Sequence, residues 1–60
     1  MSELNDQIIE TLRELADDLE AEITAKYQGL TCYPVQQRRM NRDMEPVNRA
    51  RELIRRAKLT

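Results

Sequence analysis

Apolar residues recur every three or four positions through the first half of the chain. The series comprises Leu4, Ile8, Leu12, Leu15, Leu19, Ile23 and Tyr27. Because an α-helix has about 3.6 residues per turn, this spacing predicts one helix over about residues 2–28 with a continuous apolar stripe. The pattern repeats after eleven residues, which is typical of a nearly straight helix.

Gly29 and Pro34 mark the connection that follows. Gly29 fits the position just past a helix end, where a left-handed backbone conformation is needed. Pro34 can begin the next helix, since its missing N–H costs nothing in a first turn. We therefore expect a turn over residues 29–34.

The second half, about residues 35–58, is helix-compatible but is interrupted before Pro46. It is either one kinked helix or a short helix followed by a new one. Asp43 is a good N-cap for the second case, which we favour because proline is far commoner in a first turn than in mid-helix. A narrow apolar seam follows, formed by Val47, Ala50, Ile54 and Ala57.

Sixty residues with no alternating strand pattern predict a single all-α domain over residues 1–60, folded as an antiparallel helical hairpin. So small a chain buries too little surface to be comfortably stable by itself. Cys32 is the only cysteine and there is no histidine, so neither an internal disulfide nor a metal site is expected. We expect a homodimer instead, assembled like a four-helix bundle. Its core and dimer contacts would come from Ile8, Leu12, Leu15, Leu19, Ile23, Val47, Ala50 and Ile54.

Charge is divided sharply between the two halves. Residues 1–30 hold eight acidic and two basic side chains, a net charge of −6, whereas residues 31–60 hold eight basic and three acidic ones, a net charge of +5. The simpler interpretation is that two oppositely charged helices pack together and solvate their outer faces. However, a helical projection turns most acidic residues of the first helix away from its apolar stripe. The charge then indicates what the protein binds more than how it folds.

Arginine dominates the basic half, and Arg38, Arg42, Arg49 and Arg56 follow one another at helical steps of four and seven. Guanidinium groups favour bidentate contacts to carboxylates or phosphates. Tyr33, Met40 and Met44 lie nearby and are of residue types enriched at interfaces. These seven residues are the candidate partner-binding set, although the tyrosine and the methionines could equally close the end of the small core.

No catalytic constellation can be written from these residues, and we expect a protein that is not an enzyme and has no cofactor. Glu10, Glu14 and Asp17 share a face but have no cleft to shift their pKa values. The N-terminus lacks a secretory signal and no stretch is apolar enough for a membrane span, so with one free cysteine we expect a cytoplasmic protein.

The leading hypothesis is a small interaction protein that binds itself and modulates another protein. The alternative is a dimeric nucleic-acid-binding regulator that uses the arginines. In size and shape alone the expected architecture resembles hairpin regulators of plasmids and phages that pair into four-helix bundles. A likeness of shape does not imply a function, and it assigns no residue.

Overall fold

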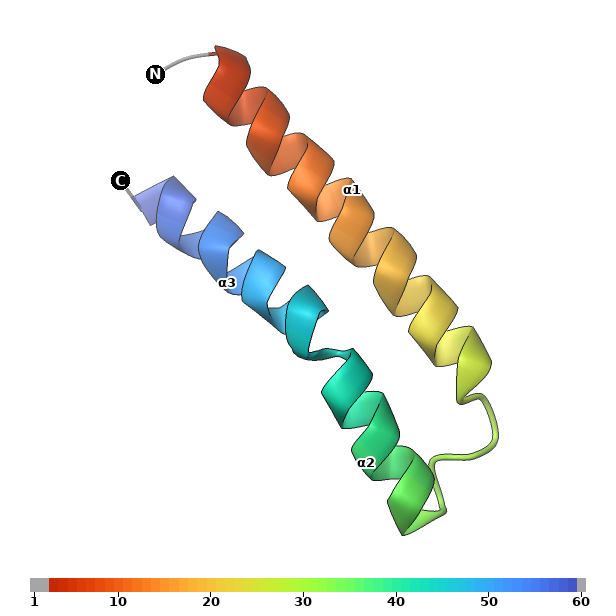
Figure 1. Ribbon diagram of the computed structural model, residues 1–60. Helices are drawn as coiled ribbons and strands as arrows, with labels where there is room; N and C mark the ends of the chain where they lie inside the picture. The colour runs from red at the N-terminus through yellow and green to blue at the C-terminus, as the bar shows by residue number, and fades with distance from the viewer. Residues whose placement is uncertain (1–2, 60) are drawn as a thin grey trace.

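The structure is a computed structural model that describes residues 3–59. It contains α1 (Glu3–Lys26), α2 (Pro34–Asp43) and α3 (Glu45–Leu59), with no strand among the described residues (Figure 1). The all-helical prediction is confirmed.

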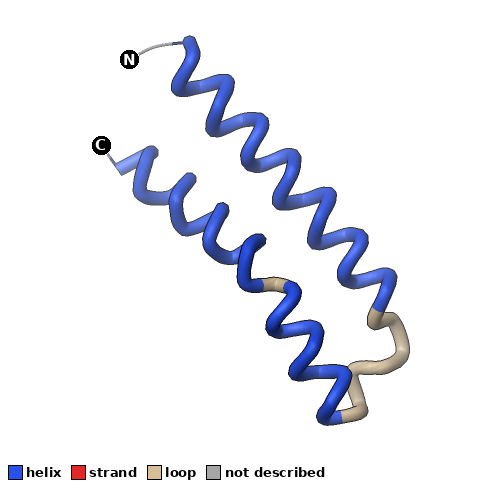
Figure 2. Tube along the Cα trace, in the orientation of Figure 1, coloured by secondary structure: helices blue, strands red, loops and turns tan. Residues whose placement is uncertain are grey.

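The first helix ends two residues earlier than the predicted boundary at residue 28. Beyond Lys26 the backbone N–H of Leu30 donates to the carbonyl oxygen of Tyr27 at 2.9 Å, and that of Tyr33 donates to Leu30 at 3.1 Å. Gly29 adopts a φ of +78°, the left-handed conformation predicted for this glycine. The chain therefore leaves α1 through consecutive tight turns, drawn as a loop in Figure 2.

The two helices of the second half are separated by Met44 alone. Pro34 opens α2, as expected, and Pro46 lies in the first turn of α3, where its missing N–H is tolerated. The prediction that Asp43 caps the second of these helices is wrong. Asp43 closes α2, and its carboxylate accepts hydrogen bonds from Tyr27 and Lys26.

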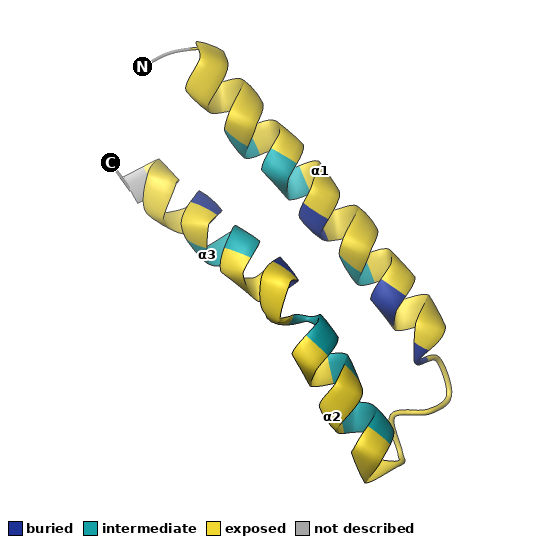
Figure 3. Ribbon diagram, viewed as in Figure 1, coloured by how far each residue is buried: buried dark blue, intermediate teal, exposed yellow. Residues whose placement is uncertain are grey.

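The helices form a flat layer that is one helix thick. α1 runs beside α3 and α2 in the opposite direction, and the molecule measures 45 × 17 × 11 Å (Figure 1). Buried residues lie along the facing sides of α1 and α3 (Figure 3). They are Ala16, Ile23, Tyr27, Val47 and Ile54, with Met40, Met44 and Ala50 partly buried against them.

The eight residues predicted for the core and dimer contacts are not equivalent in the structure. Ile23, Val47 and Ile54 are buried, and Leu12 and Ala50 are partly buried. The remaining three, Ile8, Leu15 and Leu19, are exposed. α1 therefore meets α3 through one edge of its wide apolar stripe, which leaves the other edge exposed to solvent.

Candidate interaction surfaces

Arg51 of α3 joins the two long helices on one side of the layer. Its guanidinium donates to Glu20 at 2.7 and 3.1 Å and to Asp17 at 3.0 Å. The hydrogen bonds from Arg51 lower the pKa of the Glu20 carboxyl. Sequence reasoning placed Asp17 on the outward acidic face, whereas the structure pairs it with α3. The adjacent seam residue, Ala50, was the available signal that Arg51 lies near α1.

A second set of polar contacts joins the C-terminal end of α1 to the C-terminal end of α2. The Tyr27 hydroxyl donates to Asp43 Oδ2 at 2.7 Å, and Lys26 Nζ lies 3.5 Å from the same oxygen. Lys26 Nζ also lies 5.2 Å from the centre of the Tyr27 ring. The hydrogen bond from Tyr27 is the main reason that the pKa of Asp43 is lowered. The end of α1 is thus bonded to the end of α2.

The side of the layer opposite Arg51 is apolar. At about 100° per residue, Leu15 projects roughly 90° and Leu19 roughly 50° to one side of the direction taken by Ala16 and Ile23, and Asp17 projects to the other side. On α3, Leu53 likewise projects away from the side of Arg51. We call this surface the leucine face. Its members are Leu4, Ile8, Leu15, Leu19 and Leu53, all of them exposed.

Two shallow hollows lie along the leucine face. One, of about 360 Å³, is lined by Gln7, Ile8, Thr11, Leu12 and Leu15. The other, of about 530 Å³, lies between α1 and the junction of α2 with α3, and its lining includes Leu19, Ile23 and Pro46. The face therefore has both protruding leucines and depressions between them, as helix-packing surfaces do.

The four arginines predicted to form a basic row are all exposed on α2 and α3. Arg56 is engaged by Glu52, 3.2 Å away. In contrast, Arg38 and Arg49 form no ion pair with any residue in 3–59, and neither does Arg39, which sequence reasoning did not single out. Of these three arginines, Arg38 and Arg39 lie midway along α2 and Arg49 lies on α3.

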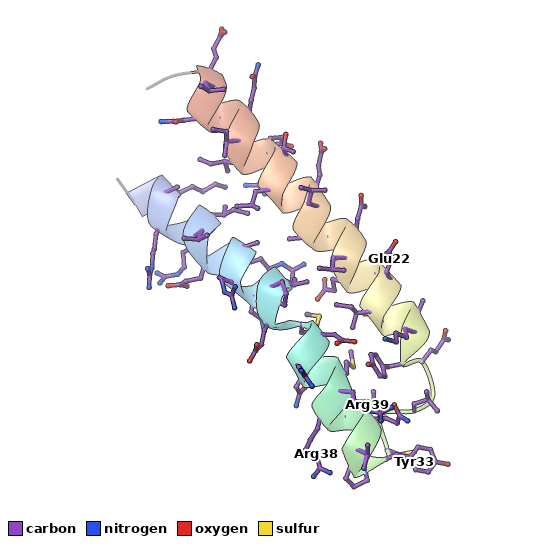
Figure 4. All side chains as sticks on the ribbon, in the orientation of Figure 1. Glu22, Tyr33, Arg38 and Arg39 are labelled. Carbon is purple, nitrogen blue, oxygen red and sulfur yellow. The ribbon has the colours of Figure 1, made fainter. Side chains whose placement is uncertain are left out.

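Exposed apolar side chains accompany these arginines at the turn. Leu30, Tyr33 and Val35 are exposed, with Tyr33 at the tip of the molecule and Arg38 directed away from α1 (Figure 4). We call Leu30, Tyr33, Val35, Arg38 and Arg39 the turn-end patch. The two methionines proposed with them, Met40 and Met44, instead pack against the core cluster.

Metal binding and membrane insertion find no support among the described residues. Residues 3–59 contain no group of three or more side chains placed to hold a metal ion, and Cys32 is exposed in the turn. No helix in this range is both long enough and apolar enough to cross a bilayer.

Comparison of the chain with protein families, with curated proteins and with solved structures found no match.

Proposed function

We propose that this is a non-enzymatic interaction protein that binds and modulates a partner protein through the turn-end patch. The observation that carries the proposal is the set of exposed, unpaired arginines beside an exposed tyrosine. Arg38 and Arg39 form no ion pair within residues 3–59, and the Tyr33 side chain is exposed at the tip. Arginine and tyrosine are the residue types that most often anchor interfaces.

The chemistry of the patch indicates the kind of partner. A guanidinium group presents donors in a planar fork that matches a carboxylate. Val35 is exposed and lies three and four positions before Arg38 and Arg39 on α2, so it shares a helix surface with them. Such a mixed surface fits a segment that alternates acidic and apolar side chains. We propose such a segment, on a protein, as the ligand.

We also propose that the active form is a pair of helical hairpins arranged as a four-helix bundle. Support comes from the leucine face, which a single chain leaves uncovered. Pairing would use the leucine face and partner binding the turn-end patch, so either proposal can be refuted without the other.

Affinity capture tests the partner proposal. The immobilised wild-type chain and the variant R38E/R39E are exposed to nuclease-treated extract of the cells that produce the protein. R55E/K58E is the matched control, because it reverses two exposed basic residues near the other end of the molecule. We expect one protein to be retained by the wild type and the control at least about tenfold more than by R38E/R39E, because hot-spot losses are about 2 kcal/mol or more and about 1.4 kcal/mol is already tenfold. Equal retention by all three, or retention by none, would contradict the proposal.

The alternative is nucleic-acid binding by the same unpaired arginines. Phosphate contacts release counterions, so the affinity for a short DNA duplex would fall steeply between about 50 and 200 mM salt. Fluorescence anisotropy with labelled duplex measures this directly. If wild type binds the duplex with that salt dependence and R38E/R39E does not, the alternative replaces the partner-protein proposal.

A further inference from the structure

The chain exposes more surface than its mass accounts for. Its accessible area is 5029 Å², whereas a compact monomer of this mass exposes about 4,100 Å². The excess of about 900 Å² is close to the roughly 800 Å² that each partner contributes to a standard protein interface. The flat, one-helix-thick layer explains the excess, because each of its broad sides lacks a neighbour.

The leucine face contributes exposed apolar area to this excess of accessible surface. Leu4 is 63% exposed, Ile8 54%, Leu15 60% and Leu53 51%. The opposite broad side is polar where Arg51 bonds to Asp17 and Glu20, and the hollow of about 660 Å³ beside these contacts is lined partly by the same two carboxylates. An interface formed by this layer would therefore use the leucine face.

The borders of the leucine face are complementary to each other in charge. The border on α1 includes Glu22, and the border on α3 includes Arg49. In a two-fold symmetric dimer every contact occurs twice, with the roles of the copies exchanged. A surface that is acidic along one edge and basic along the other can thus complement a second copy of itself.

Two symmetric arrangements can cover the face, and charge discriminates between them. In one, the turns lie at opposite ends of the dimer and α1 packs on α1 of the second copy, which brings two acidic helices together. In the other, the turns lie at the same end and α1 packs on α3 of the second copy, which brings acidic and basic helices together. Opposite charges across an interface favour the second arrangement, and juxtaposed like charges disfavour the first.

The register within one chain fixes which residues would meet. Arg51 bonds to Asp17 and Glu20, so residues of α1 and α3 at the same level have numbers that add up to about 70. Leu53 therefore lies level with the stretch from Leu15 to Leu19, and Arg49 lies level with Glu22.

We propose that the leucine face binds a second copy of this chain, with α1 of each copy packed on α3 of the other and both turns at the same end. This inference rests on the hairpin pairing proposed above and specifies its geometry. Leu53 of each copy packs over Leu15 and Leu19 of the other, and Glu22 of each copy pairs with Arg49 of the other. The turn-end patches of both copies then lie together at one end of the dimer.

Cys32 provides the test, since it is the only cysteine, is exposed and lies in the turn. A nitroxide attached to Cys32 in the full chain allows the distance between the two copies to be measured by double electron–electron resonance. We expect a distance below about 30 Å, because packed helix layers lie about 10 Å apart. A distance near the 45 Å length of the molecule would overturn the geometry while leaving the pairing itself intact. No intermolecular distance at all would overturn both.

Charge exchange provides the second arm. Separately, E22R and R49E should each weaken dimerisation severalfold, and E22R/R49E should restore it, because the exchange recreates both pairs. E14R, on the outward side of α1, is the matched control and should leave the dimer unchanged. If the loss of dimer affinity in E22R/R49E equals the combined losses of the two single variants, the pairing of Glu22 with Arg49 is refuted. Partner capture by the turn-end patch is measured separately, so its failure is distinguishable from this one.

Discussion

Val47 is the most deeply buried side chain among the described residues, at 1% exposure, and it forms one small core cluster with Ala16, Ile23 and Tyr27 of the first half of the chain. The burial of each apolar side chain contributes about 1.5–3 kcal/mol. With so few of them buried, individual polar contacts at the ends of this core matter more than they would in a larger domain.

The hydrogen bond from Tyr27 to Asp43 is the contact that we expect to give a measurable pH dependence. It lowers the pKa of Asp43 in the folded state. A carboxyl whose folded pKa is depressed stabilises the fold fully above its unfolded pKa, near 3.9, and loses that contribution as the pH falls through the folded value. Y27F should therefore be less stable than wild type at neutral pH, and the difference should shrink between about pH 5 and pH 2.

Thermal unfolding of wild type and Y27F from neutral pH to pH 2 measures this. Y33F is the matched control, since Tyr33 is exposed and should leave the pH profile unchanged. A constant difference between Y27F and wild type over the whole range would show that the hydroxyl does not act through Asp43. All three proteins should also lose stability in acid because Glu20 and Glu52 become protonated. The pKa values of these carboxyls are lowered by Arg51 and Arg55, respectively.

At the scale of elements, the position of Gly29 determines how α1 leaves its last turn. Its φ of +78° lies in the region that side-chain-bearing residues avoid, although nothing lies within 4 Å of where a Cβ would be. The cost of substitution is therefore conformational strain, with no steric clash. G29A should lower the free energy of unfolding by about 1–2 kcal/mol.

Urea unfolding at fixed protein concentration checks this prediction, with G29N as the comparison. Asparagine tolerates the left-handed region better than alanine does. G29N should therefore fall between G29A and wild type. A G29A protein as stable as wild type would contradict the backbone geometry of this turn.

The sequence predicted the elements better than their contacts. Helical periodicity, Gly29 and Pro46 are local signals, and they located the helices and the interruption between α2 and α3. The choice of which edge of a wide stripe meets α3 depends on how closely the helices approach, and the small side chain of Ala16 is buried at the edge that packs. Likewise, Asp43 had two possible roles, and only the approach of Tyr27 favours one over the other.

The candidate sites divide in the same way. The spacing of the arginines predicted that they are exposed, but it did not predict which of them form ion pairs. Glu52 pairs with Arg55 and Arg56, and Arg49 forms no ion pair within the described chain. Met40 and Met44 are of interface type by composition, yet the proximity of α1 draws them into the core.

At the scale of the whole molecule, the flat layer separates two exposed surfaces. The leucine face occupies one broad side, and the turn-end patch extends from Tyr33 at the tip to Arg38 and Arg39 on α2 (Figure 4). A dimer with both turns at the same end would present two turn-end patches together. Such an arrangement would let one bivalent partner engage both patches, with a gain in avidity.

Association through the leucine face is the claim on which the whole-molecule account depends, and the mass in solution tests it most directly. Sedimentation equilibrium at micromolar concentration should give twice the 7.1 kDa chain mass for wild type. L15S/L19S removes four leucines per dimer, each worth about 1.5–3 kcal/mol of burial, and should sediment as a single chain. V35S alters a residue outside the face whose exposure, 50%, lies between those of Leu19 and Leu15, and it should remain dimeric. A folded wild-type protein that sediments at 7.1 kDa would contradict the account.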